Sequence, residues 1–413
     1  MSLVSTTGAI PFPRGKNTMN QTFASAFAIA TTVLFGACGS LPRWEDTIKA
    51  PAFQAVREIV VANVQLDSAI TGTANGRVVV AKEKLFDKTV LLGALESYDV
   101  VSGSKIAERI PTGDWRETWH SGALVAGAKG EALIGLGGEF RQINSDLADT
   151  QRFDQAYTYV NPVWTPSGWL IGGADKFDGG DSVKYYFNDP TGDSPPSFAF
   201  DGCGWVRGIA KLGHTTFAVV SRRDGNAKNW FELLTFTKGA QHVYRALKTD
   251  TGRVGGYCGG LQGLELLAIE ADRAREEVIV VWSFDKDENY ELHVTAFSED
   301  GRLLRDQKLL SRYERVYAAK IFRGGVAVVG LSKLGAGGFT LKLISTDSTI
   351  KEGEAIPNKD VDSVSSFRIA QADPSHLVVA YTSPSRTAAQ VRSTVLKVYD
   401  LGPGPGDEPL HLE

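Results

Sequence analysis

The residue types that most often carry chemistry are scattered along this chain of 413 residues. Its six histidines show no metal-ligand spacing such as H-E-x-x-H: His120, His214, His242, His293, His376 and His411. The sequence also contains no G-x-S-x-G elbow and no Walker loop, so nucleophilic catalysis and phosphate binding have no local motif. These observations favour a non-enzymatic protein without a cofactor.

One acidic segment carries oxygen-bearing side chains at alternate positions. Asp285, Asp287 and Asn289 are the residue types that ligate a hard cation such as calcium. The segment lacks the glycine at the sixth position and the full spacing of a calcium loop. A solvated turn between two strands explains the same residues, so calcium is the weaker of the two interpretations.

Tryptophan and arginine recur in segments near the ends of the expected strands. Both types are enriched at interface hot spots, which makes these positions candidates for a binding rim. The candidate residues are Trp115, Arg116, Trp119, Trp205, Arg222 and Trp230. The alternative is that the tryptophans pack between sheets.

Cys38 is the residue with the most informative context. An apolar run at 23–37 precedes it, Arg14 and Lys16 precede that run, and no acid occurs before Glu45. A basic start, an apolar centre and small residues before a cut make a secretory signal. The segment resembles the signal of bacterial lipoproteins, whose cysteine is acylated and becomes the first mature residue. That resemblance implies export and anchoring through Cys38, at the outer membrane or in the periplasm of a Gram-negative cell. An ordinary signal peptide, an uncleaved anchor and a buried core helix are the alternatives.

Removal of residues 1–37 changes the formal charge from −4 to −4 − 2 = −6, because two bases and no acids are lost. A mildly acidic chain without a basic block is a poor nucleic-acid binder. We therefore expect a protein or an envelope polymer as the partner. Cys203 and Cys258 remain as a pair in similar glycine-rich contexts. An oxidising compartment favours a disulfide between them, and two separate buried thiols are the alternative.

Short apolar runs broken by Gly, Asp, Asn and Ser predict strands joined by tight turns. A hairpin of one strand, a short turn and a very apolar strand recurs seven times. The copies lie at 58–80 (with a longer turn), 123–136, 162–173, 208–220, 268–282, 318–329 and 368–380. An alternating strand follows several copies, and a fourth strand can follow that one, which indicates a four-stranded unit.

The repeat predicts an all-β chain that folds as a β-propeller with seven four-stranded blades. Its mean period is (400 − 57)/7 = 49 residues, which is within the range of propeller blades. Six or eight blades are alternatives, since the apolar strands near Ile134 and Leu170 are only 36 residues apart, a spacing that looks too short for a complete blade. Two stacked β-sandwiches are the competing architecture.

Two segments resemble parts of known propeller families. Residues 168–173, followed by 182–189, resemble a kelch blade, and the turn at 98–105 is similar to turns of quinoprotein-like propellers. The predicted organisation is a signal peptide (1–37), a tether (38–56), the propeller (57–401) and a Pro/Gly-rich acidic tail (402–413). The rival to a binding or scaffold protein is an exported propeller hydrolase or lactonase with a metal site at the channel mouth.

Overall fold

The computed structural model describes residues 52–402, apart from 65–67, 74, 87–88, 112–118, 128–129, 137–138, 155–158, 175–181, 202–203, 224–228, 238–239, 249–263, 287–288, 311–313, 333–337 and 385–391. All described residues belong to one compact unit, 51–413. The predicted signal peptide, the lipidation site Cys38 and residues 403–413 of the predicted tail lie outside the described residues.

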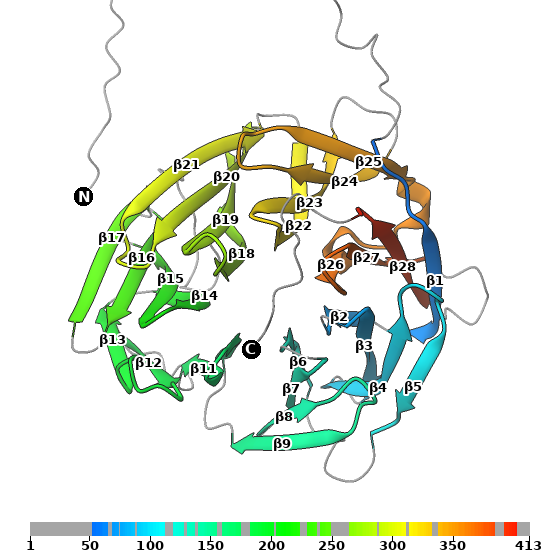
Figure 1. Cartoon of the computed structure of the whole chain (residues 1–413), viewed down its shortest axis with the longest axis horizontal. Helices are drawn as coiled ribbons and strands as arrows, with labels where there is room; N and C mark the ends of the chain where they lie inside the picture. The colour runs from blue at the N-terminus through cyan, green and yellow to red at the C-terminus, as the bar shows by residue number, and fades with distance from the viewer. Residues whose placement is uncertain are drawn as a thin grey trace, which may run out of the picture. The chain divides into compact units, whose positions relative to one another are not determined.

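The described strands form seven four-stranded sheets, and each sheet is one blade of a β-propeller (Figure 1). The first three blades in chain order are β2 (Ser68–Gly72), β3 (Arg77–Phe86), β4 (Thr89–Asp99) and β5 (Lys105–Arg109); β6 (Trp119–Ala126), β7 (Ala132–Leu136), β8 (Glu139–Ile143) and β9 (Asp149–Asp154); and β10 (Tyr159–Thr165), β11 (Gly168–Ala174), β12 (Ser182–Asn188) and β13 (Ser197–Asp201). The prediction of an all-β propeller with seven blades is confirmed.

The next three blades follow the same order. They are β14 (Gly204–Leu212), β15 (Thr215–Arg223), β16 (Asn229–Thr237) and β17 (Ala240–Lys248); β18 (Leu264–Asp272), β19 (Glu277–Lys286), β20 (Asn289–Ser298) and β21 (Leu303–Leu310); and β22 (Glu314–Phe322), β23 (Gly325–Ser332), β24 (Phe339–Ile344) and β25 (Ile350–Ile356). The helical elements of the described residues are two short 3₁₀ turns, η3 (Asn358–Asp360) and η4 (Val364–Ser366).

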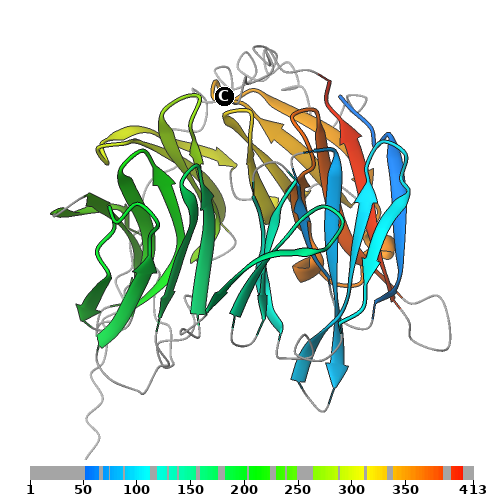
Figure 2. The same cartoon turned by 60° about the horizontal axis from the view of Figure 1, so that its bottom comes forward.

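The last blade joins the two ends of the repeat. It contains β26 (Arg368–Gln371), β27 (His376–Ser383) and β28 (Arg392–Asp400), and its outermost strand is β1 (Arg57–Val64). β1 pairs antiparallel with β28, with Ile59 opposite Leu396, and Figure 2 shows the first and last strands side by side. The first strand of every blade contacts the first strands of its two neighbours, β2 with β26 included. The blades therefore close into a ring, which excludes two stacked sandwiches.

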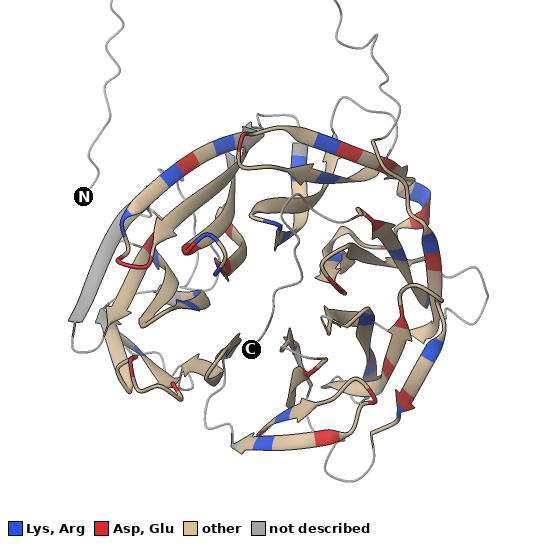
Figure 3. Cartoon of the chain, in the orientation of Figure 1, with Lys and Arg blue, Asp and Glu red and all other residues tan. Residues whose placement is uncertain are grey.

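The second strand of a blade is the most apolar because both of its faces are covered by neighbouring blades. All five residues of β7 are buried, and Val78, Val79 and Val80 of β3 are fully buried. Outermost strands are more polar, as in β25, where the first three residues are exposed. Along the outer strands, charges of both signs alternate (Figure 3). Within the described residues, no helix is long and apolar enough to cross a membrane.

Two details of the predicted repeat are wrong. The hairpin predicted at 58–80 does not exist, because β1 pairs with β28 while β3 pairs with β2. The spacing of 36 residues between Ile134 and Leu170 accommodates a complete blade. It does so because β7 and β8 have only five residues each and β9 has six.

Candidate functional site

The predicted tryptophan and arginine rim is only partly within the described residues. Trp115 and Arg116 lie outside them. Trp119 and Trp205 lie in β6 and β14, but their side chains are outside the described part. The two cysteines of the predicted disulfide, Cys203 and Cys258, also lie outside.

Arg222 and Trp230 are the two rim candidates that the structure brings together. They are opposite each other on β15 and β16. Both bind the buried carboxylate of Glu232: Arg222 Nε is 3.1 Å from Oε2, and Trp230 Nε1 donates to Oε1 at 3.0 Å. Their polar groups are therefore directed at a neighbour within the same blade, an arrangement that orders the sheet.

The predicted calcium segment forms the end of a hairpin. Asp285 and Asn289 lie at the ends of β19 and β20, where Lys286 is opposite Asn289. Asp287 lies outside the described residues, as do the side chains of Asp285 and Asn289, so calcium binding stays a prediction. Elsewhere in the described part, no group of three or more His, Cys, Asp and Glu residues is placed to hold a metal ion.

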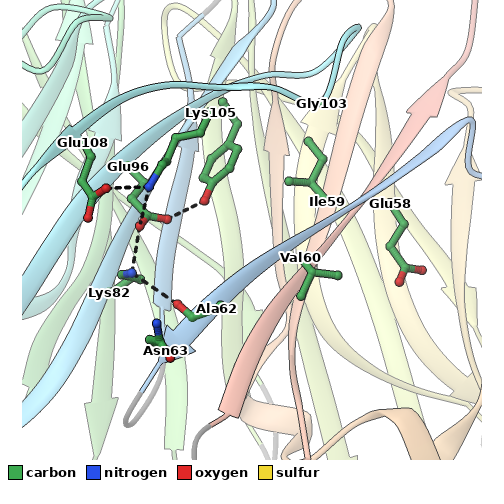
Figure 4. Close-up of a pocket in the computed structure, with 11 residues that line it drawn as sticks. Glu58, Ile59, Val60, Ala62, Asn63, Lys82, Glu96, Gly103, Lys105 and Glu108 are labelled. Carbon is green, nitrogen blue, oxygen red and sulfur yellow. Dashed lines mark hydrogen bonds and ion pairs between the residues drawn. The ribbon is translucent and has the colours of Figure 1, made fainter.

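A groove of about 540 Å³ lies where the closing strand β1 meets the blade formed by β2–β5 (Figure 4). Its volume is in the range of about 300–1,000 Å³ that is typical of ligand sites. One wall is β1, with Glu58, Val60, Ala62 and Asn63. The other wall is the face of the first blade, with Lys82, Glu96, Tyr98, Lys105 and Glu108. The groove therefore separates the outer strands of two adjacent blades.

Glu96 is the centre of the polar wall. Its side chain is only 5% exposed, and Lys82 Nζ lies 2.8 Å from Oε1. The Tyr98 hydroxyl donates to Oε2 at 2.5 Å. A carboxylate buried this deeply requires such partners, because an unpaired buried charge costs several kcal/mol. Lys82, Glu96 and Tyr98 thus hold one another in fixed positions at the base of the groove.

The outer part of the polar wall is more accessible. Lys105 Nζ lies 2.5 Å from Glu108 Oε2 and 3.7 Å from Glu96 Oε1. The ion pair with Lys105 lowers the pKa of Glu108. Burial and the hydrogen bond to Glu96 raise the pKa of the Tyr98 hydroxyl, which therefore stays a neutral donor. The groove thus combines a fixed base with an accessible pair, Lys105 and Glu108.

The opposite wall is the outer edge of a sheet. β1 is terminal in its sheet, so only one of its edges pairs with β28. Across the groove, Lys82 Nζ donates to the Ala62 carbonyl at 3.3 Å. Main-chain groups of alternate residues in a strand point to the same edge, so those of Glu58 and Val60 face the groove as well. A bulge between Val61 and Val64 ends this regular edge.

This site can bind and orient a ligand through main-chain donors and acceptors on one wall and charged groups on the other. Sequence reasoning did not find it. The sequence feature that could have indicated the site is a charged residue within an apolar run. Lys82 follows the buried residues of β3, and Glu96 lies among the leucines of β4. Those residues meet β1 only because the ring closes, and the sequence had indicated another pairing for β1.

A second buried polar network lies between the third and fourth blades. Lys211 Nζ is 2.6 Å from Asp189 Oδ2 and 3.2 Å from Asp193 Oδ2. Burial alone raises the pKa of Asp189, but hydrogen bonds from Lys211 and Ser194 outweigh it and hold the pKa well below its usual value. The side chains of Lys211 and Asp189 are almost completely buried. Asp189 also accepts hydrogen bonds from Thr191 and Ser194, so this network joins two blades.

Comparisons with known proteins show no family for this chain. No protein-family model and no curated protein matches the chain. Among solved structures, it is similar to a protein of unknown function from Dyadobacter fermentans, with 11% identity and a TM-score of 0.43 over 84% of this chain and 100% of that one. It is also similar to puromycin hydrolase, with 14% identity and a TM-score of 0.49 over 83% of this chain and 54% of that one.

A third similar structure is the β-propeller domain of the Trilobed protease from Pyrococcus furiosus, with 11% identity and a TM-score of 0.45 over 82% of this chain and 98% of that one. The chain spans only about half the length of puromycin hydrolase. At these identities and TM-scores, none of the three similarities assigns an activity or a partner to this chain.

Proposed function

We propose that this chain is an exported propeller, anchored by a lipid on Cys38, that acts as a binding or scaffold protein in the bacterial cell envelope. Its partner is another protein or an envelope polymer, and the groove beside β1 is the contact site. The observation that carries this proposal is the groove itself, in which Glu96 and Lys82 are held by neighbours while Lys105 and Glu108 remain accessible.

The anchoring part of the proposal rests on the apolar run and the small residues before Cys38. Metabolic labelling with an alkyne fatty acid and membrane fractionation test it. Wild-type chain is expected to carry the label and to sediment with membranes. Cys38→Ala should lose both properties, and a labelled Cys38→Ala chain would contradict anchoring at this residue.

The binding part is tested by a photo-crosslinking amino acid placed at Lys105, whose side chain is 43% exposed at the groove. The matched control is the same amino acid at Arg302, which is exposed in the turn between β20 and β21. We expect a discrete adduct in cells from position 105 and none from position 302. Absence of any adduct from the groove, with position 302 also silent, would contradict the proposed contact site.

A further inference from the structure

The groove beside β1 has the features of a site for an extended polypeptide. We propose that it takes a peptide strand of a partner protein, added to the outer edge of β1 and carrying basic side chains. This inference rests on the proposed binding function and specifies its partner. It follows from the free edge of β1, from the same kind of pairing elsewhere in the molecule, and from the charge of the groove.

The edge of β1 presents the pattern that an incoming strand recognises. Main-chain groups of Glu58 and Val60 face the groove, and the Ala62 carbonyl on the same edge accepts a hydrogen bond from Lys82. Strand addition draws its affinity from main-chain hydrogen bonds, with side-chain pockets at alternate positions. From Glu58 to Val61, before the bulge, the edge is about 13 Å long at about 3.3 Å per residue, which suits a short strand.

The chain already adds an extended segment to an outermost strand at the adjacent blade. Ala52 N donates to the Glu352 carbonyl at 2.8 Å, and Glu354 N donates to the Phe53 carbonyl at 3.1 Å. Phe53 and Gly353 form a parallel bridge on β25. Thus the outer edge of β25 is covered by a segment of the chain itself. Among the described residues, no strand pairs with the corresponding edge of β1.

Exposed apolar side chains are frequent on or near the two strands that flank the groove, β1 and β5. Nine large hydrophobic residues are exposed in the described part of the chain, and five of them lie on or next to β1 and β5: Val56, Val60, Val101, Ile106 and Ile110. Val60 alone is 57% exposed. Natural proteins usually protect such edges with charges or proline. β1 has charges only at its start, Arg57 and Glu58, and is apolar over 59–62, so this part of its edge is suited to pairing.

The charge of the groove favours a basic strand. Its lining contains three acids, Glu58, Glu96 and Glu108, and two bases, Lys82 and Lys105, which gives −3 + 2 = −1. Glu96 is bound by Lys82 and Tyr98 and is almost completely buried. Glu58 and Glu108 each pair with one lysine, Lys397 at 4.0 Å and Lys105 at 2.5 Å, but they are 53% and 39% exposed. These two acids can bind lysine or arginine side chains of the added strand.

The test uses the full chain in mild detergent and two fluorescent probes, a short peptide that alternates valine with lysine and its valine–glutamate counterpart. We expect the lysine probe to bind with a Kd below about 1 mM and at least about tenfold more tightly than the glutamate probe. Val60→Pro should abolish binding, because it removes a main-chain donor that faces the groove. Proline is tolerated at such outward-facing positions of edge strands. Val60→Thr keeps the donor and should bind normally.

If Val60→Pro unfolds the protein, a charge-reversal variant still tests the proposal. Glu108→Lys, combined with Glu58→Lys, should weaken the lysine probe and strengthen the glutamate probe. Three results would overturn the proposal. The lysine probe could bind wild-type protein and a folded Val60→Pro variant with equal affinity, or it could show no binding with a Kd below about 1 mM. Sedimentation could also show that a second copy of this chain pairs with β1. A groove adduct in cells without peptide binding would reject the strand while leaving the proposed function intact.

Discussion

The seam between the third and fourth blades and the seam beside β1 are both contacts between adjacent blades, but they are filled by different kinds of side chain. In the first, Tyr185, Phe187 and Phe198 of one blade meet Phe236 of the next, with ring centroids 4.8 Å apart for Phe198 and Phe236. In the second, the inner part is apolar, but the outer part holds Glu96, Lys82 and a groove of about 540 Å³. The aromatic seam stabilises the ring, whereas the polar seam leaves volume and charge available to a ligand.

The largest effect is expected from breaking the aromatic seam. Phe236 is 1% exposed and contacts both Phe187 and Phe198. Phe236→Ala should lower the free energy of unfolding by about 3–5 kcal/mol, since it removes buried area and leaves a cavity. Ile106→Ala, at an exposed position beside the polar seam, should change it by less than about 0.5 kcal/mol. Urea unfolding of both variants checks this contrast.

The polar end of the aromatic seam should respond to acid. The pKa of Asp189 is held below its usual value, so its stabilisation is present above about pH 4 and is lost as the pH falls through the folded-state pKa. At pH 7, Asp189→Asn should cost about 2–3 kcal/mol, because it removes a hydrogen-bonded charge from Lys211. Urea midpoints between pH 7 and pH 3 should fall more steeply for wild type than for Asp189→Asn. Parallel curves would contradict this role.

A smaller loss of stability is expected at the base of the groove. Glu96→Ala removes the partner of Lys82 and Tyr98, but water in the groove can replace part of those bonds. We expect a cost of about 1–2 kcal/mol. Glu96→Gln, which retains an acceptor for Tyr98, should cost less. If Glu96→Ala lowered the free energy of unfolding as much as Phe236→Ala, the polar seam would stabilise the ring as strongly as the aromatic seam does.

The smallest effect on stability should come from the accessible pair. Lys105 and Glu108 are 43% and 39% exposed, and ion pairs of this kind contribute at most about 1 kcal/mol. Lys105→Ala should therefore leave the thermal midpoint almost unchanged. Its effect should appear in binding, as altered affinity for the lysine probe in fluorescence anisotropy. A large fall in the thermal midpoint without any change in affinity for the lysine probe would show that Lys105 stabilises the fold and does not contribute to binding.

The repeat could be predicted from sequence because each blade is a local unit. Hairpins such as β14–β15 and β22–β23 have short turns, and their second strand is apolar, as in β15, whose centre is completely buried. The predicted hairpin at 58–80 failed because β1 is an apolar strand like the others, and its pairing with β28 depends on ring closure across more than three hundred residues.

The groove could not be predicted for the same physical reason. Lys82 and Glu96 are 14 residues apart and meet through the register of β3 and β4. The wall that makes them a site is β1, whose place is set by the far end of the chain. By contrast, Arg222 and Trp230, chosen by residue type, are brought together around Glu232, which the sequence analysis did not single out.

The most direct test of this contrast replaces the charged base of the groove by apolar side chains of similar size. Lys82→Met combined with Glu96→Leu removes both members of the pair, an exchange that is often neutral or stabilising by about 1–4 kcal/mol. If the polar seam serves binding, this double variant should unfold at an equal or higher urea concentration than wild type and should lose the adduct from position 105. Lower stability by more than about 3 kcal/mol, with the adduct retained, would contradict the account.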